Sequence, residues 1–191
     1  MNAITLLKQD HGNVETLFKR YEALADDAKP TDKRDIVEKV ITQLSVHAEL
    51  EEQLLYPALR ERLPEDGDVL EGIEEHHVAK VLLWELDKLP ATSERYDAKM
   101  AVLMEAIRHH VGEEEEDGGL FDQARKAFKG TELDEMGEKM ADLRKVAPTR
   151  PHPLSPDQPP LNTLIGLPVA VLDRVYTTGK DLVTKALNRS A

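Results

Sequence analysis

The chain has 191 residues, which is enough for one well-buried domain with an extension. Its formal net charge of −12 gives an acidic surface that repels phosphates, so a nucleic-acid partner is not expected. The chain contains no cysteine, which excludes disulfides and thiolate chemistry, and no apolar run suits a signal peptide or a membrane span, so we expect a cytoplasmic protein.

The first half of the chain is predicted to form two long helices. The first covers residues 2–27 and ends before a Lys-Pro pair. The second begins with Thr31 or Asp32 as its N-cap and continues to residue 63. Pro57 lies inside this second helix and predicts a kink at that point, because proline cannot donate a backbone hydrogen bond.

Two further long helices follow. The third is predicted over residues 68–89, and the fourth starts near Ser93 and continues past His110. The Gly118-Gly119 pair is expected to interrupt the fourth helix. Because short loops join four long helices, we expect an all-α, up-down-up-down antiparallel four-helix bundle.

The composition changes after the bundle. Gly130 is expected to end a helix, and Thr131 can cap a short helix that follows. The segment PTRPHPLSPDQPP holds six prolines in thirteen residues and indicates an extended strap, in which His152 should be exposed. An amphipathic helix is then predicted over residues 168–188, and we favour its packing on the acidic bundle over membrane binding. The expected divisions are a bundle over residues 1–130, a short helix over 131–147, and a proline-rich linker with a C-terminal helix over 148–191.

Every predicted bundle helix carries an apolar stripe with alternating spacings of three and four, and histidine interrupts each stripe. In the second and fourth helices a glutamate follows one turn later. The second helix shows the pattern as Ile36, Val40, Leu44, His47, Glu51 and Leu54. Across the four helices the interrupting residues are His11, His47, Glu51, His76, His110 and Glu114. Antiparallel packing brings these positions to a similar depth in the bundle.

A single histidine on an apolar face is most often a satisfied core residue, and a lone HxxxE motif is often a surface pair. Six buried polar groups on four helices are different, because their burial without partners would be very costly. Metal ligation makes such a placement favourable. Four imidazoles and two carboxylates suit a pair of first-row transition ions better than calcium or magnesium. Two metals with six protein ligands keep open positions, which predicts chemistry with a small molecule.

The stretches DHGNV, HAELEEQLLYP, EEHHVAK and HHVGEEEEDGGLF together resemble the hemerythrin-like family, the HHE cation-binding domains. The pattern H…HxxxE…H…HxxxE carries this resemblance, which extends to residue 128, and the C-terminal extension is similar to that of some actinobacterial members. The resemblance implies two iron ions (Fe2+/Fe3+) with an oxo or hydroxo bridge, and the six residues named above are the ligands by motif match.

The same resemblance implies a protein that binds or turns over dioxygen, hydrogen peroxide or nitric oxide, with oxidative or nitrosative stress as the expected setting. The enzymatic form would be a catalase- or peroxidase-like activity. The alternative is a sensor or an iron or zinc store without turnover.

Two features differ from the family pattern. Oxygen-carrying hemerythrins have a second histidine four residues after the third-helix ligand, where this chain has Lys80, so simple reversible oxygen carriage is not expected. The residues before Leu120 are more numerous than usual, so Glu115 stays an alternative to Glu114. His76 is preferred to His77 because it lies nearer the centre of the apolar arc.

Overall fold

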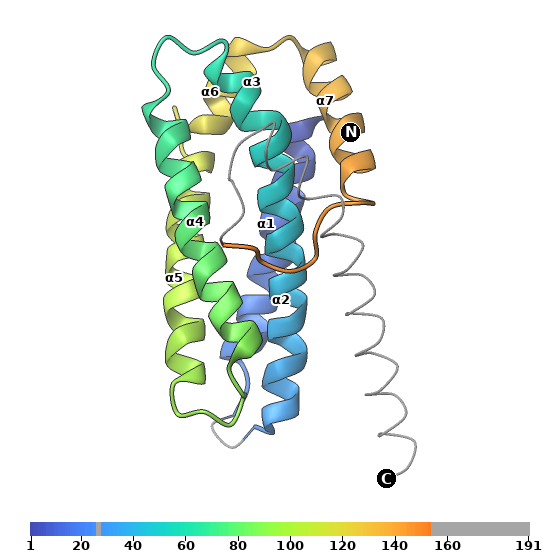
Figure 1. The fold of residues 1–191 in the computed structure, drawn as a ribbon. Coiled ribbons are helices and arrows are strands. Elements are labelled where there is room, and N and C mark those ends of the chain that lie inside the picture. Colours follow the sequence, from blue (N-terminus) through green and yellow to red (C-terminus); the bar gives the residue numbers. More distant parts are fainter. Residues whose placement is uncertain (26–27, 154–191) are drawn as a thin grey trace.

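The computed structural model describes residues 1–25 and 28–153, and these residues are helical wherever they form regular structure (Figure 1). The all-α prediction is therefore confirmed, while the predicted helix over residues 168–188 lies outside the described residues. The described elements, in chain order, are α1 (Ala3–Glu22), α2 (Pro30–Leu50), the π-helix η1 (Glu51–Leu55), α3 (Tyr56–Arg60), α4 (Gly67–Lys88), α5 (Tyr96–Glu115), α6 (Leu120–Ala127) and α7 (Gly130–Leu143). Within the described part of the chain, no helix has the length and hydropathy that a bilayer-crossing segment needs.

Four long helical segments run antiparallel to their neighbours in chain order: α1, the continuous α2–η1–α3 segment, α4 and α5 (Figure 1). Helix α1 packs against α2, α2 against α4, and α4 against α5. The remaining side is joined by Arg108 of α5, whose guanidinium donates to Glu15 at 3.0 Å and to Glu22 at 2.7 Å on α1. The predicted up-down-up-down four-helix bundle is confirmed.

The second helical segment contains a π-turn instead of a simple kink at Pro57. Proline has no N–H, and just before it the Tyr56 N–H donates to the carbonyl of Glu51, five residues back. The wider turn inserts an extra residue and shifts the inward-facing positions. Leu55 is therefore buried in place of Leu54, which the sequence pattern placed in the stripe. The same shift buries Glu52 beside Glu51.

Several predicted boundaries are wrong by a few residues. Helix α1 ends at Glu22 because Tyr21 is its last buried residue, and further turns would gain little from packing. Helix α5 ends before Gly118, whose φ of 90° favours glycine, so the predicted interruption is confirmed. Gly130 is the first residue of α7 and not a helix end, and Lys129 replaces Thr131 as the N-cap.

Helices α6 and α7 close one end of the bundle. Helix α6 packs against α5, and α7 packs against α1 and η1. The approach of α7 to the start of α1 needs Gly137, because a Cβ there would lie 2.2 Å from the carbonyl oxygen of Met1. The two short helices therefore shield the bundle end next to the polar residues of the core.

After α7 the chain crosses α2 and α4 (Figure 1). Arg150 is buried in this crossing and pairs with Glu38 of α2 at 2.6 Å and with Asp87 of α4 at 3.1 Å. His152 is half-buried, so the expectation that it is exposed was wrong. The first part of the predicted strap therefore contacts the bundle. The positive charge of its arginine is attracted to the acidic surface of two helices.

The apolar core consists of two clusters separated by a polar layer. One cluster includes residues of α6 and α7, and the other fills the opposite end of the bundle. In α1, Leu7 belongs to the first cluster and Val14 to the second, and His11 lies between them. The same holds in α2, where His47 lies between Leu44 and Leu50. Histidines of α4 and α5 occupy the same layer. The fold therefore surrounds its polar residues with hydrophobic packing above and below.

Candidate metal centre

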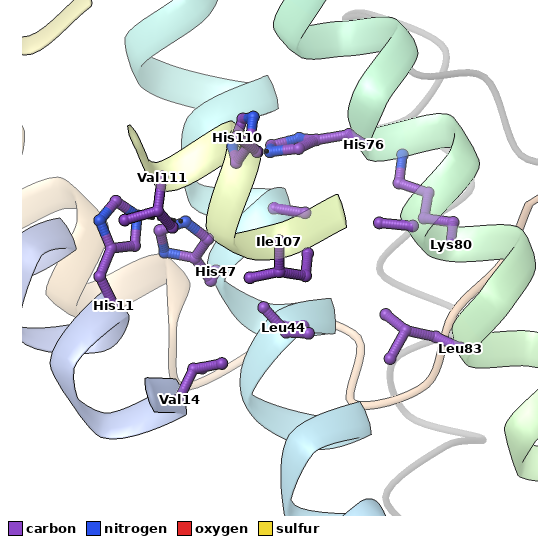
Figure 2. A pocket seen from close by; sticks show the side chains of 12 residues that line it. His11, Val14, Leu44, His47, His76, Lys80, Leu83, Ile107, His110 and Val111 are labelled. Atoms are coloured by element: carbon purple, nitrogen blue, oxygen red, sulfur yellow. Dashed lines mark hydrogen bonds between the residues drawn. The ribbon is translucent and has the colours of Figure 1, made fainter. Parts of the chain in front are cut away.

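Four imidazoles meet in the polar layer, one from each long helical segment. They are His11 of α1, His47 of α2, His76 of α4 and His110 of α5, and none is more than 7% exposed. The Nε2 atoms of His11 and His47 lie 3.1 Å apart, and those of His76 and His110 also lie 3.1 Å apart. Figure 2 shows the histidines as two such pairs, with each pair's rings turned toward one another.

Two buried glutamates connect the two imidazole pairs. Glu51 Oε2 lies 3.1 Å from Nε2 of His47 and 3.3 Å from Nε2 of His76. Glu114 Oε2 lies 3.5 Å from Nε2 of His11 and 3.6 Å from Nε2 of His110. Each carboxylate therefore contacts one histidine from each pair, which is the placement that a bridging ligand requires.

Among the residues that the structure describes, some carboxylate oxygens of the cluster lack hydrogen-bond partners, and a cation could take the place of those partners. Neither oxygen of Glu51 accepts a hydrogen bond from the described residues, and nor does Oε2 of Glu114. Unpaired buried polar atoms cost folding free energy, and a cation at the centre would remove that cost. The donor atoms form two groups, each within 4.8 Å, and both contain Glu51: one is His11, His47, Glu51 and Glu114, and the other is Glu51, His76 and His110.

A second set of carboxylates holds the outer nitrogens of the imidazoles. Oxygen to Nδ1 distances are 2.7 Å for Glu115 to His11, 2.9 Å for Glu52 to His76 and 2.8 Å for Glu75 to His110. Such pairs favour the tautomer with hydrogen on Nδ1 and leave the Nε2 lone pair facing inward.

His47 is the exception among the four, because its Nδ1 lies 3.6 Å from Asp10, beyond hydrogen-bond distance. Asp10 is held instead by a bidentate contact with Arg144, at 2.9 and 2.6 Å. Arg144 is the C-cap residue of α7, so the C-terminal part of the fold reaches the outer side of one imidazole.

Sequence reasoning missed Asp10, Glu52 and Glu75. Each stands next to or near a histidine in the sequence, but each faces a histidine of another helix. Glu115, which the sequence left as an alternative ligand, lies on the outer side of His11, while Glu114 lies at the centre.

Tyr56 and Lys80 complete the surroundings of the cluster. The Tyr56 hydroxyl is buried and donates to Glu114 Oε1 at 2.9 Å. Burial, with repulsion from nearby carboxylates, raises the pKa of Tyr56 well above its usual value, so the hydroxyl stays protonated. Lys80 Nζ donates to Glu52 Oε2 at 2.7 Å and so stabilises the carboxylate that holds His76. The lysine therefore supports an outer carboxylate.

The ionisable groups of the cluster strongly perturb one another. Burial and repulsion by Glu51 raise the pKa of Glu114 to about 7. Burial disfavours charge on Glu51, but the neighbouring imidazoles outweigh it and lower the pKa of Glu51 well below its usual range. Burial likewise opposes charge on His47, yet Glu51 and Asp10 raise the pKa of His47 to about 10. Protons are therefore held by the same atoms that would ligate metal, so the two compete.

A small cavity adjoins the imidazoles. It has a volume of about 20 Å³, which is room for about one water-sized molecule. Figure 2 shows its aliphatic wall below the histidines, and this wall includes Leu44, Leu83 and Ile107. On the outer side a larger groove between α1 and α5 shares His11 and Val111 with the cavity.

The structure thus brings all six sequence-predicted residues into one cluster. The neighbouring histidines lie elsewhere: His77 is half-buried outside the cluster, and the side chain of His109 is 64% exposed. That the six residues ligate metal stays a prediction, supported by their geometry.

The helical bundle and the histidine–carboxylate cluster in its core place this protein in a class of metal-binding proteins. Residues 2–119 match the model of the hemerythrin HHE cation binding domain, and the chain belongs to this family. A crystal structure of a hemerythrin HHE cation binding domain-containing protein from Mycobacterium kansasii has the same fold, with a TM-score of 0.64 and 23% identity, over 76% of this chain and 86% of that one.

Two curated proteins are also similar. An uncharacterised hemerythrin-like protein of Schizosaccharomyces pombe is 25% identical over 169 residues, which is 87% of this chain and 81% of the relative. A DNA nickase of a Nostoc strain is 28% identical over 115 residues, which is 60% of this chain but 32% of the nickase. The second similarity therefore concerns a minor part of that enzyme.

Proposed function

We propose that the protein holds two iron ions in the buried cluster and there binds, or reacts with, a small oxidant such as dioxygen, hydrogen peroxide or nitric oxide. The observation that carries this proposal is the arrangement of two imidazole pairs spanned by two carboxylates, next to a cavity of about 20 Å³. A storage site would need no such cavity beside its ligands.

The proposed ligands are His11 and His47 for one ion, His76 and His110 for the other, and Glu51 and Glu114 between them. Nitrogen-rich sets with carboxylates suit iron and other first-row ions. Iron at this site would supply redox chemistry and an open position for the small molecule.

The surrounding residues fix and isolate this site. The outer carboxylates orient the imidazoles, and the Tyr56 hydroxyl orients Glu114 through its hydrogen bond of 2.9 Å. The aliphatic wall of the cavity excludes bulk water and larger ligands. The size of the cavity supports ligands of two or three non-hydrogen atoms, because it has room for little more than one water molecule.

The groove between α1 and α5 supports a route for a small neutral ligand. It has a volume of about 420 Å³, and it shares Val14, Ile107 and Val111 with the inner cavity. These side chains form the partition between the groove and the cavity. A ligand that crosses this partition arrives beside His11.

Metal analysis and an optical spectrum of the purified protein test the centre. We expect close to two iron ions per chain and near-ultraviolet bands of a bridged di-iron site. His47→Ala should abolish binding of at least one ion while the protein stays helical by circular dichroism. Full iron content in that variant would contradict the ligand assignment.

Addition of hydrogen peroxide to the iron-loaded protein separates enzyme from sensor. Continuous evolution of dioxygen would establish a catalase-like activity. A spectral change that stops after one equivalent would instead establish stoichiometric binding or reaction. No spectral change with peroxide, dioxygen or nitric oxide would contradict the proposal and leave metal storage.

A further inference from the structure

A second pocket lies between α4, the end of α5 and the turn before α6. Its volume is about 150 Å³, and none of the described residues that line it is a lysine or an arginine. Carboxylates form most of its polar wall: Asp68, Glu71, Glu75, Glu113, Glu114 and Glu116. A pocket of one charge sign raises the local concentration of ions of the opposite sign. This pocket therefore favours cations over anions.

Two of the lining residues, Glu75 and Glu113, form the geometry of a metal site together with His109 beside the pocket. His109 Nε2 lies 3.2 Å from Glu113 Oε1, one helical turn later, and 3.6 Å from Glu75 Oε1 on α4. Their donor atoms lie within 4.8 Å of one another. The side chains of His109 and Glu113 are 64% and 42% exposed, so an ion from solvent reaches them directly.

The pocket extends from Glu75 and Glu113 to the buried centre. Its lining includes His110 and Glu114, which are 4% and 1% exposed. Glu114 Oε2 has no hydrogen-bond partner among the described residues, and this oxygen is part of the buried cluster. Glu75 connects the two levels, because one of its oxygens faces His109 and the other accepts a hydrogen bond from His110 at 2.8 Å.

We propose that Glu75, His109 and Glu113 form an outer capture site for a divalent cation, from which the ion passes along the acidic pocket to His110 and Glu114. The inference rests on the proposed buried metal centre, since that centre is the destination of the ion. The ordinary alternative is a solvated acidic surface with no function in loading. A solvated surface would not explain why His109 converges with two carboxylates of a pocket that also reaches the buried Glu114.

His109→Gln and Glu113→Gln test the capture site without touching the buried cluster. Glu75→Gln is less suitable, because it would also disturb His110. Glu105→Gln is the matched control: it removes one exposed carboxylate from the same helix α5, away from the pocket. All variants are made in the full chain, and circular dichroism verifies their helical content.

The first measurement concerns the outer site alone. Protein with a filled buried centre is titrated with Mn²⁺, and the free ion is followed by electron paramagnetic resonance. We expect one further Mn²⁺ per chain in the unchanged protein. In the two rim variants, His109→Gln and Glu113→Gln, the affinity for this ion should fall by about tenfold or more, a loss typical of altered metal surroundings. Equal binding in the rim variants and the control would overturn the capture site.

The second measurement concerns loading. Metal-free protein is mixed with Fe²⁺ under anaerobic conditions, and uptake is followed by stopped flow at low and high ionic strength. In both rim variants we expect uptake slower by about tenfold or more, because each variant lacks one ligand of the capture site. In Glu113→Gln the slowing should be greater at low ionic strength, because this variant also lacks one negative charge of the pocket. The final metal content of the buried centre should be unchanged.

The remaining outcomes distinguish this inference from the proposed centre. Uptake at the unchanged rate in both rim variants would overturn the entry route and leave the centre intact. Equal slowing by Glu105→Gln would also overturn it, because general charge would then explain the rate. Failure of the unchanged chain itself to retain iron would refute the proposed centre, and a Mn²⁺ titration of the metal-free chain and its variants would then decide whether the outer site exists.

Discussion

Withdrawal of metal from the buried cluster should lower the melting temperature of the protein substantially. The reason lies in the metal-free cluster, where both oxygens of Glu51 and Oε2 of Glu114 are buried without hydrogen-bond partners. Each unpaired buried group of this kind costs about 1–3 kcal/mol of folding free energy. Bound metal would satisfy these oxygens in the folded chain and not in the unfolded one.

The size of the effect follows from linkage. Free metal at 100 times its dissociation constant stabilises the folded state by about 2.7 kcal/mol for each site. A domain of this size shifts its melting temperature by about 2–4 °C for each kcal/mol, so one occupied site should add about 5–11 °C. Two independent sites should add about twice that shift at the same relative concentration.

Glu51→Gln is the sharpest companion to metal removal. Glutamine has nearly the same shape, but it lacks the charge with which Glu51 contacts His47 and His76 at 3.1 and 3.3 Å. The variant should therefore lose at least half of the metal-dependent shift. Glu49→Gln is the control, because it removes a carboxylate from the same helix and outside the cluster.

Differential scanning calorimetry of chelated and metal-loaded protein measures these shifts, and metal analysis of the same samples gives the occupancy. Equal melting temperatures with and without metal would show that the cluster binds no ion in the folded protein. A full metal-dependent shift in Glu51→Gln would show that this carboxylate does not span the two imidazole pairs.

Three further changes have defined outcomes. The metal-free protein should lose stability as pH rises from 6.5 through about 10. Burial opposes charge on His47 and His76, but neighbouring carboxylates raise the pKa of His47 to about 10 and that of His76 to about 9. A raised pKa stabilises the folded state fully below the pKa of the unfolded chain, and this stabilisation is lost as pH rises through the pKa of the folded chain. Thermal melts across this range check the loss, which the metal-loaded protein should not show, since metal replaces the protons. Tyr56→Phe removes the hydroxyl that donates to Glu114 and should destabilise the metal-free protein by about 1–3 kcal/mol in denaturant titrations. Arg150→Gln leaves two carboxylates of the α2–α4 interface with one fewer partner and should cost about 1–3 kcal/mol in the same assay without changing metal content.

The position of the cluster could be predicted from the sequence because it depends on two simple regularities. Helical periodicity determines which side chains share a face, and antiparallel packing with short loops determines their depth. His11 and His47 meet for these reasons alone, at 3.1 Å between their Nε2 atoms. The choice of His76 over His77 follows in the same way, because the former lies nearer the centre of the apolar arc.

The π-turn could not be placed from the pattern. A proline within a helix removes one hydrogen bond, and the neighbouring turn can respond by kinking or by widening. Here it widens over Glu51–Leu55, so that Leu55 replaces Leu54 in the core and Glu52 enters beside Glu51. The contact of Glu52 with His76 is a direct consequence of that extra residue. In a regular helix, Glu52 would be expected to point away from the core.

The outer carboxylates were missed for a different reason. The chain has 37 acidic residues, and a sequence pattern cannot tell which of them turns toward a histidine of another helix. Asp10 adjoins His11 in sequence but faces His47, and Glu115 follows Glu114 but lies on His11. These contacts depend on side-chain positions that only the packed bundle determines, including the contact of Arg144 with Asp10 from beyond α7.

The surroundings of the cluster make its two imidazole pairs inequivalent. His11, from one pair, adjoins the groove between α1 and α5, where the basic side chains of Lys8 and Arg108 lie among acidic ones. His110, from the other pair, adjoins the acidic pocket between α4 and α5, whose charge favours cations. A neutral ligand gains nothing from the acidic pocket, whereas a metal ion does. The two proposals therefore give the centre two separate entry routes, one beside His11 for small oxidants and one beside His110 for metal ions. A substitution in the oxidant route should leave the rate of metal uptake unchanged, and a substitution in the metal route should leave the rate of oxidant binding unchanged.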